Sequence, residues 1–320
     1  MILHYFVTYR CNLRCNFCEL WKLGQWKLGQ LKEELTVGEL EEHLPIFREL
    51  ESVVFLGGEP FLKRELVSIV RAFVKKYGSG LGVCFITNGQ FPDLIKKTLE
   101  EIRSFHSYLS CSVSIDGTKE IHDKIRGREG AFDKAVETLK MLGEMDIWKD
   151  LSFTISPLNY YQTYEIFELS KKLGCSFSTR LAHDLDHQTF TRNQLEIIDG
   201  QLNRIAEEKE ELALEPESFI HAYYLRSIVE VYRTGKRKVP CLAGMNFLIL
   251  DPYGDMYPCF NSYWCKEGYG NPEMRIGNIK ENSFEEIEKR RVEVVKDRLK
   301  PWKCNRCWNE CDVSSFKVIK

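Results

Sequence analysis

The sequence carries no excess of charge of either sign and no long apolar run. Its 45 basic residues are balanced by 47 acidic ones, for a net charge of −2, so the composition does not favour nucleic acid as a partner. No uninterrupted apolar stretch reaches the roughly 18–20 residues of a membrane span. The first residues also lack the basic region, apolar core and cleavage site of a signal peptide. We therefore expect a cytoplasmic protein with no membrane span.

Cysteine, in contrast, is abundant and unevenly placed. The chain has 12 cysteines, and in a cytoplasmic protein clustered cysteines indicate metal-binding or catalytic sites rather than disulfides. Three lie within 11–18 and six within 241–311. The other three, Cys84, Cys111 and Cys175, are scattered between these zones and are most simply small core residues. Two cysteine-rich zones around a cysteine-poor body predict two metal sites.

The first zone is the run CNLRCNFC, which contains Cys11, Cys15 and Cys18 and directly follows the strand-like opening MILHYFVTYR. A [4Fe–4S] cluster normally has four cysteine ligands. Three would leave one iron without a protein ligand, and an open position is where chemistry can occur. Three cysteines alone could also form a zinc knuckle. With only ten residues before Cys11, we expect no N-terminal peptide-recognition domain.

The first 185 residues or so alternate strand-like and helix-like runs. Amphipathic patterns separate the strand candidates, and one of them begins with the capping box Thr36–Glu39. Six βα repeats imply a parallel sheet with outer helices, and six is fewer than the eight of a closed barrel. We therefore predict an α/β fold, a partial and open (β/α)6 TIM-like barrel. The six strand candidates are 2–9, 52–59, 81–88, 108–116, 151–157 and 175–182.

Four short motifs follow successive predicted strands. Active sites of such barrels form at the carboxyl ends of the strands, and these ends carry the cysteine run, GGEP (57–60), TNG (87–89) and SIDG (114–117). The glycines of GGEP would let a ligand approach the backbone, and strand-end carbonyls with Glu59 nearby could receive an ammonium group. A tight turn before the next helix is the alternative explanation of GGEP.

Together, these motifs resemble the signature of the radical S-adenosylmethionine (SAM) enzymes, especially the peptide- and sugar-modifying branch, in which SIDG is followed by a run such as IHDKIRGREGAF (121–132). The resemblance implies a [4Fe–4S] cluster on Cys11, Cys15 and Cys18, with SAM on its open iron. Arg126 would face the SAM carboxylate, with Arg128 and Arg180 as alternatives. Ser114 and Asp116 would lie near the SAM ribose. The full set of implied SAM-binding residues is Gly57, Gly58, Glu59, Pro60, Thr87, Asn88, Ser114, Asp116 and Arg126.

The second cysteine zone resembles the opening of the SPASM or twitch extension that follows many radical SAM barrels. Cys241 is followed by twelve residues, Gly254, four residues and Cys259, and a turn at 251–254 would form a hairpin that delivers Cys259 to a metal. Two fully ligated auxiliary cubanes need eight cysteines, whereas this zone has six. The resemblance therefore implies one auxiliary [4Fe–4S] cluster, and a structural zinc site is the alternative. The expected ligands are Cys241, Cys259, Cys304 and Cys307, with Cys311 or Cys265 as substitutes.

We predict three segments: a radical SAM partial barrel (1–190), a helical bridge (191–238) and an auxiliary-cluster domain (239–320). Two loops have open interpretations. The repeat WKLGQWKLGQ (21–30) is either a lid or a local duplication. The other loop, either substrate-binding or simply solvated, contains His183, Asp184, Asp186 and His187.

The resemblance implies a radical SAM oxidoreductase or modifying enzyme. It would cleave SAM reductively to a 5′-deoxyadenosyl radical that abstracts hydrogen from a substrate C–H bond. We predict peptide or protein modification assisted by the auxiliary cluster. Dehydrogenation or epimerisation of a sugar, aminoglycoside or lipid precursor is the first alternative, and Cys265 could then donate hydrogen. A non-catalytic iron–sulfur electron carrier or zinc-binding module is the alternative of another class. The expected partners are a reductant such as flavodoxin or ferredoxin and a peptide or small-molecule substrate.

Overall fold

Six parallel strands alternate with helices in the first part of the chain. The computed structural model describes residues 1–23, 33–182, 190–211, 216–239, 242–265, 268–269, 271–298 and 308. Each strand pairs in parallel with the next one along the chain, and in the described residues the sheet has two free edges. The predicted α/β fold with an open parallel sheet is confirmed. The strands are β1 (Ile2–Thr8), β2 (Ser52–Gly57), β3 (Gly82–Thr87), β4 (Leu109–Ser114), β5 (Trp148–Ile155) and β6 (Ser176–Leu181).

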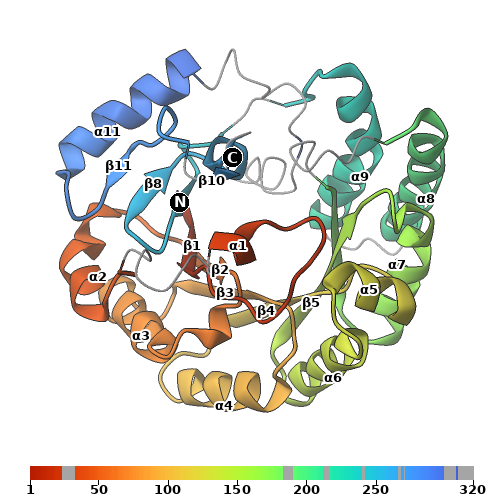
Figure 1. Ribbon diagram of the computed structural model, residues 1–320, viewed down its shortest axis with the longest axis horizontal. Coiled ribbons are helices and arrows are strands. Elements are labelled where there is room, and N and C mark those ends of the chain that lie inside the picture. Colours follow the sequence, from red (N-terminus) through yellow and green to blue (C-terminus); the bar gives the residue numbers. More distant parts are fainter. Residues whose placement is uncertain are drawn as a thin grey trace.

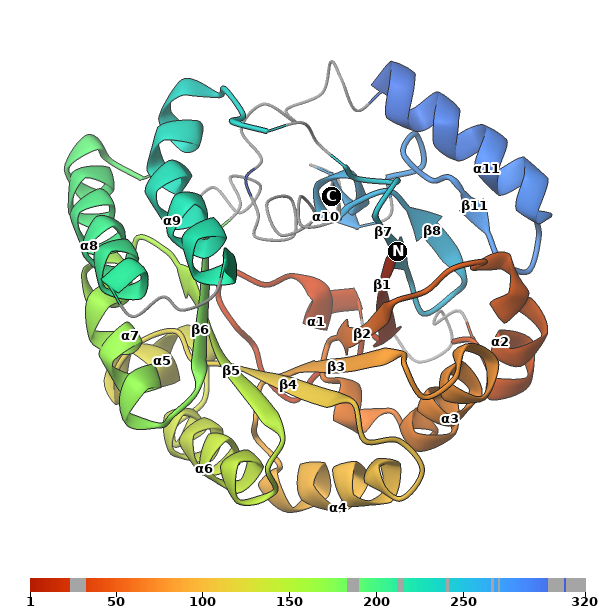
Figure 2. The ribbon, with the colours of Figure 1, turned by 180° about the vertical axis from the view of Figure 1, so that it is seen from behind.

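Helices cover the outside of this curved sheet (Figure 1). Local sequence signals mark the ends of these helices. Thr36 and Glu39 form the predicted capping box at the start of α2. Gly78, with φ +84°, ends α3. The short α1 (Leu20–Leu23), which follows the cysteine run, lies inside the arc of strands instead (Figure 2). The outer helices are α2 (Val37–His43), α3 (Leu66–Tyr77), α4 (Pro92–Arg103), α5 (Lys119–Arg126), α6 (Ala131–Glu144) and α7 (Thr163–Lys172). Short 3₁₀ turns occupy Leu44–Ile46, Pro60–Leu62 and Tyr160–Gln162.

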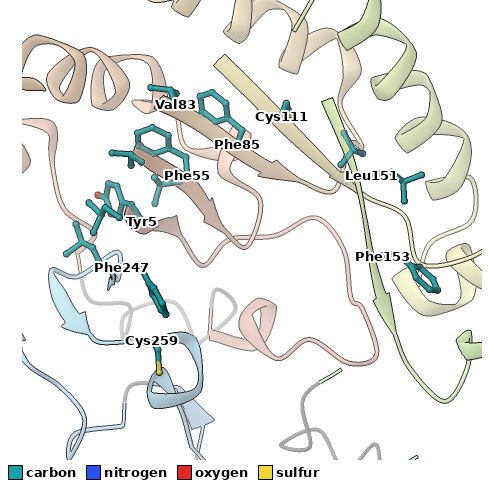
Figure 3. Close-up of a cluster of buried hydrophobic side chains, with 14 of the residues drawn as sticks. Tyr5, Phe55, Val83, Phe85, Cys111, Leu151, Phe153, Phe247 and Cys259 are labelled. Atoms are coloured by element: carbon teal, nitrogen blue, oxygen red, sulfur yellow. The ribbon is translucent and has the colours of Figure 1, made fainter. Parts of the chain in front are cut away.

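The two faces of the sheet differ in chemistry because strand side chains alternate. The outward side chains form a continuous hydrophobic core with the helices, shown in Figure 3 around Phe55, Phe85 and Phe153. Of the three scattered cysteines predicted as core residues, Cys111 is fully buried in this core, whereas Cys84 and Cys175 are only partly buried. The alternate positions of β4 to β6 face inward and carry mostly hydroxyl groups, as with Ser152 of β5. The fold thus places a polar surface inside the arc of strands.

The sheet extends further than the six predicted strands, to nine among the residues that the structure describes. Strand β7 (Phe247–Leu250) pairs in parallel with β1, β8 (Asp255–Tyr257) is antiparallel to β7, and β11 (Gly277–Asn278) is antiparallel to β8. All four residues of β7 are buried, because this apolar strand covers the edge that β1 would otherwise expose. The C-terminal part of the chain therefore continues the barrel sheet.

The predicted turn at 251–254 joins β7 to β8. Asp251 Oδ1 accepts hydrogen bonds from the backbone N–H groups of Tyr253 and Asp255, both at 2.9 Å, and Gly254 adopts φ +95°. After this hairpin, α10 (Phe260–Tyr263) packs against the inner side of β1, with the Phe260 ring 4.9 Å from that of His4. The hairpin and α10 thereby bring the C-terminal cysteine zone to the interior of the barrel.

Two long helices lie between the barrel and this C-terminal part: α8 (Arg192–Glu211) and α9 (Pro216–Thr234), within the segment predicted as a helical bridge. None of the helices in the described part of the chain combines the length and apolar character needed to cross a bilayer. The remaining elements are β9 (Trp264–Cys265), β10 (Gly268–Tyr269), α11 (Phe284–Glu293) and a π-helical turn (Val294–Arg298).

Candidate active site

A cavity of about 370 Å³ opens inside the arc of strands and collects residues of all four predicted motifs. Apolar side chains of β1 to β3, such as Phe6, Leu56 and Ile86, also line it. As predicted, the four motifs lie together at one rim of the barrel, where they line the same cavity. Its predicted site residues are Cys11, Cys15, Cys18, Gly57, Gly58, Thr87, Asn88, Ser114 and Arg126.

The cysteine-bearing loop (11–18) is fastened to the end of α5. The backbone N–H of Asn16 donates to the Ile125 carbonyl at 2.9 Å, and that of Arg14 donates to the Arg126 carbonyl at 3.3 Å. Cys15 is buried beneath this clamp, while the other two cysteines are partly exposed to the cavity. These two backbone bonds hold the loop against α5 and do not depend on the identity of its side chains.

The three thiols lie in surroundings that disfavour bare thiolates. Burial raises the pKa of Cys11 to about 11 and that of Cys18 to about 12. Burial also raises the pKa of Cys15, although the Arg126 guanidinium opposes this. At neutral pH the thiols hold their protons, so a metal must displace those protons on binding. Among the described residues, no three His, Cys, Asp or Glu side chains converge as one metal ion would require, whereas a cubane takes each thiolate on a separate iron.

The glycines at the end of β2 are required by the chain itself. The Gly58 N–H donates to the Thr8 carbonyl and the Glu59 N–H to the Arg10 carbonyl, both at 2.8 Å. A Cβ on Gly58 would lie 2.2 Å from the Arg10 oxygen, and one on Gly57, where φ is +137°, would lie 2.3 Å from the Thr8 oxygen. Only glycine lets the two strand ends approach this closely.

Glu59 is buried at the end of β2. It is not among the described residues that line the cavity, and only 1 % of it is exposed. Its carboxylate accepts hydrogen bonds from Thr87 Oγ1 and the Asn88 N–H at 2.8 Å, and from the Phe61 N–H at 3.3 Å. Pro60 is likewise buried, at the start of a 3₁₀ turn. Glu59 therefore joins the ends of β2 and β3, and its expected place near the ammonium group of SAM stays a prediction.

Asp116 also lies below the cavity rather than in it. It is fully buried, outside the described cavity lining, and its Oδ2 pairs with Arg126 Nη2 at 2.5 Å while its Oδ1 accepts from the Thr154 N–H at 3.0 Å. Arg126 Nη1 in turn donates to Cys15 Sγ at 3.7 Å. Burial alone would lower the pKa of Arg126, but Asp116 and Cys15 raise it, so the guanidinium stays charged. Asp116 thus supports Arg126, and its expected place near the SAM ribose stays a prediction.

The wall of the cavity formed by β5 and β6, which continues from Ser114 of β4, was not predicted from the sequence apart from Arg180. It carries hydroxyl groups from β5 and β6 and the exposed Arg180. Arg180 has no hydrogen-bond or ion-pair partner in the described part of the chain, whereas the other alternative, Arg128, is not among the described lining residues. The alternation of polar and apolar residues in LSFTIS and CSFSTR was the sequence signal for this wall. The wall comprises Ser152, Thr154, Ser178, Thr179 and Arg180.

Most of the second cysteine zone lies outside the described residues. Cys259 is buried, after β8, and the next residue, Phe260, lines the cavity. The backbone of Cys265 belongs to β9, but its side chain is not described. The ligands of the auxiliary cluster therefore stay a prediction. The predicted residues outside the description are Cys241, Cys304, Cys307, Cys311, His183, Asp184, Asp186, His187 and most of the 21–30 repeat.

Comparison with protein families now identifies the class. Residues 5–174 match the model of the radical SAM superfamily, and residues 241–308 match the SPASM iron–sulfur cluster-binding domain. The chain belongs to the radical SAM superfamily and carries a SPASM domain. The first assignment implies a [4Fe–4S] cluster and SAM as cofactors, and the second implies auxiliary iron–sulfur binding. The predicted family and cofactors are confirmed at this level.

Individual relatives are distant. The chain is 24% identical to an AdoMet-dependent heme synthase of Oleidesulfovibrio alaskensis, over 88% of this chain and 72% of that protein. It is 26% identical to the antilisterial bacteriocin subtilosin biosynthesis protein AlbA of Bacillus subtilis, over 88% of this chain and 58% of that protein. Among solved structures, Streptococcus suis SuiB bound to S-adenosylmethionine matches with a TM-score of 0.66 at 17% identity, over 98% of this chain and 69% of SuiB. The last likeness is one of fold.

Replacing Gly58 with Ala tests the close approach of β2 to the cysteine loop. We expect Gly58→Ala to lower the melting temperature of the metal-free protein and to reduce iron uptake on reconstitution, because the new Cβ would collide with a backbone oxygen. Gly38→Ala is the matched control: no atom lies within 4 Å of its Cβ, and in helix α2 it should stabilise by about 0.5–1 kcal/mol. Equal stability and iron content in both variants would contradict this account.

The buried Glu59 carboxyl predicts a pH dependence of stability. Burial raises its pKa from 4.5 to about 7, so the native state binds this proton more tightly than the unfolded chain does. Its contribution is fully present below about pH 4.5 and is lost as the pH rises through about 7. The stability of the metal-free wild type relative to Glu59→Gln should therefore fall across this range in thermal unfolding. The exposed Glu41→Gln serves as control, and a pH-independent difference for Glu59→Gln would refute the buried carboxyl.

Proposed function

We propose that this protein is a radical SAM enzyme that modifies a peptide or protein. The observation that carries the proposal is the single cavity in which Cys11, Cys15 and Cys18 meet the motif residues of β2, β3 and β4. Three cysteines would bind three irons of a [4Fe–4S] cluster and leave the fourth without a protein ligand. Bound here, the cluster and SAM supply a reductive cleavage that yields a 5′-deoxyadenosyl radical able to abstract hydrogen from a C–H bond.

The residues of the chain have separate tasks in this proposal. Arg126 offers a guanidinium, and Ser114 a hydroxyl, to the polar groups of SAM at the cysteine side of the cavity. Phe6, Leu56 and Ile86 line the same cavity with apolar surface, which keeps water away from reactive species. The electron must come from outside the chain, and a small reductant such as flavodoxin or ferredoxin is the partner we propose.

The wall formed by β5 and β6 is where we place the substrate. Ser152 and Thr154 present hydroxyl groups that both donate and accept hydrogen bonds. Ser178 donates its proton to Asp150 Oδ2 at 2.7 Å and offers an acceptor. Such groups suit the amides of a peptide. The relationship to the subtilosin biosynthesis protein AlbA supports a peptide or protein substrate. A tetrapyrrole is the second candidate, supported by the relationship to a heme synthase and by Arg180, whose guanidinium could bind a porphyrin carboxylate.

For the C-terminal part we propose one auxiliary [4Fe–4S] cluster on Cys241, Cys259, Cys304 and Cys307, with Cys311 or Cys265 as substitutes. The position of Phe260 in the cavity wall supports a cluster close to the substrate. We also propose the division into a barrel (1–190), a helical bridge (191–238) and an auxiliary domain (239–320), which the helices α8 and α9 support.

Loss of one cluster cysteine should abolish SAM cleavage. We expect the anaerobically reconstituted and reduced wild type to release 5′-deoxyadenosine from SAM and Cys15→Ala to release none, because the cluster loses a ligand. Cys84→Ala, at a partly buried cysteine of β3, is the matched control and should retain cleavage. Undiminished release from Cys15→Ala, measured by chromatography, would exclude the proposed site. No release from the iron-loaded wild type would instead favour an electron carrier or binding module.

Replacing Cys259 should impair the proposed auxiliary cluster without affecting the cluster that binds SAM. We expect Cys259→Ala to contain less iron and sulfide than the wild type after reconstitution while it still cleaves SAM, because Cys11, Cys15 and Cys18 remain. Iron and sulfide assays, alongside 5′-deoxyadenosine release, provide the measurement. An unchanged iron content would remove Cys259 from the ligand set.

A further inference from the structure

Asn88, the second residue of the TNG motif, holds a fixed orientation at the end of β3. Only 6 % of it is exposed. Its side-chain Oδ1 accepts a hydrogen bond from the backbone N–H of Gln90 at 3.1 Å. Because a backbone N–H can only donate, this bond identifies the oxygen of the amide and leaves the NH₂ group on the other side. The amide cannot turn over without breaking this bond.

The NH₂ group of Asn88 faces the cysteine loop. Its Nδ2 donates to Cys11 Sγ at 3.8 Å and to Asn12 Oδ1 at 2.9 Å. These two acceptors use both of its protons. Asn88 therefore contacts the first cysteine directly, and its donor capacity is directed at the cysteine loop.

A second set of bonds fixes the backbone that carries Asn88. Its N–H donates to Glu59 Oε2 at 2.8 Å, and its carbonyl accepts from Gln90 Nε2 at 3.2 Å. Gln90 Nε2 also donates to the Ala131 carbonyl at 2.9 Å, which ties the loop to α6. A donor held from several directions in a buried place costs little to orient and acts strongly on its acceptor.

We propose that Asn88 is a positioning residue that raises the reduction potential of the cluster by donating a hydrogen bond to the sulfur of Cys11. This inference rests on the proposed function, in which Cys11 binds an iron. Reduction adds one electron to the cluster, and part of the added negative charge falls on the sulfur ligands. A hydrogen bond to a sulfur stabilises the more negative state, and such bonds are among the factors that set cluster potentials.

The test is a redox titration of the reconstituted full chain without SAM, followed by electron paramagnetic resonance. The signal of this cluster is identified by its absence from Cys15→Ala. We expect the midpoint potential of Asn88→Ala to be more negative than that of the wild type. Asn88→Asp keeps the acceptor for Gln90 but places a carboxylate beside the sulfur, so its potential should be more negative still. Asn16→Ala, which removes an exposed amide from the same loop, should leave the potential unchanged.

The outcomes are distinguishable. The graded order of wild type, Asn88→Ala and Asn88→Asp would support the proposal, because a residue with a purely structural role would not produce it. If Asn88→Ala fails to retain iron, the midpoint potential of Asn88→Asp is compared with that of the wild type, and a more negative value supports the proposal. Unchanged potentials, or loss of the cluster from both variants, would overturn the inference and leave Asn88 a purely structural residue. If no signal depends on Cys15, the proposed function itself fails.

Discussion

The site depends on two buried carboxylates, Glu59 and Asp116, which hold the residues that donate hydrogen bonds to the cysteine loop. Glu59 holds the loop of Asn88, which donates to Cys11 Sγ, and Asp116 holds Arg126, which donates to Cys15 Sγ. Each carboxylate is almost fully buried, and burying such groups is costly unless partners compensate them. Their bonds therefore specify one arrangement of the strand ends, and through it the positions of two of the three thiols.

Much of the fold was predictable because its signals are local. The six barrel strands are short apolar runs bounded by turn residues, and their carboxyl ends carry the motifs, so the shared rim followed from topology alone. The addition of β7 to the edge of β1 was not predictable. The segment FLIL (247–250) has the composition of an apolar strand, but this composition does not indicate which strand it pairs with. Its partner is set by which edge of the folded barrel remains uncovered.

The sequence predicted where the site residues lie along the fold, but not which groups their side chains contact. A sequence shows that Glu59 and Asp116 follow strands, but whether a carboxylate points into the cavity or beneath it depends on the donors around it. For Glu59 these donors come from β3, and for Asp116 they come from α5 and β5. The wall formed by β5 and β6 differs, since its alternating pattern was present in the sequence and needed only the knowledge that these strands line the same cavity as the motifs.

One cavity collects the cysteines and motif residues, the adjoining hydroxyl groups and Arg180 of β5 and β6, and Phe260 from the C-terminal part. The central claim is that the cysteine side holds a cluster with one iron open to SAM. The most direct test is the electron paramagnetic resonance spectrum of the reduced protein before and after SAM is added. The account predicts that SAM changes the g values of the cluster signal, because it becomes a ligand of the open iron. A spectrum that SAM leaves unchanged, from protein with its full iron content, would contradict the claim.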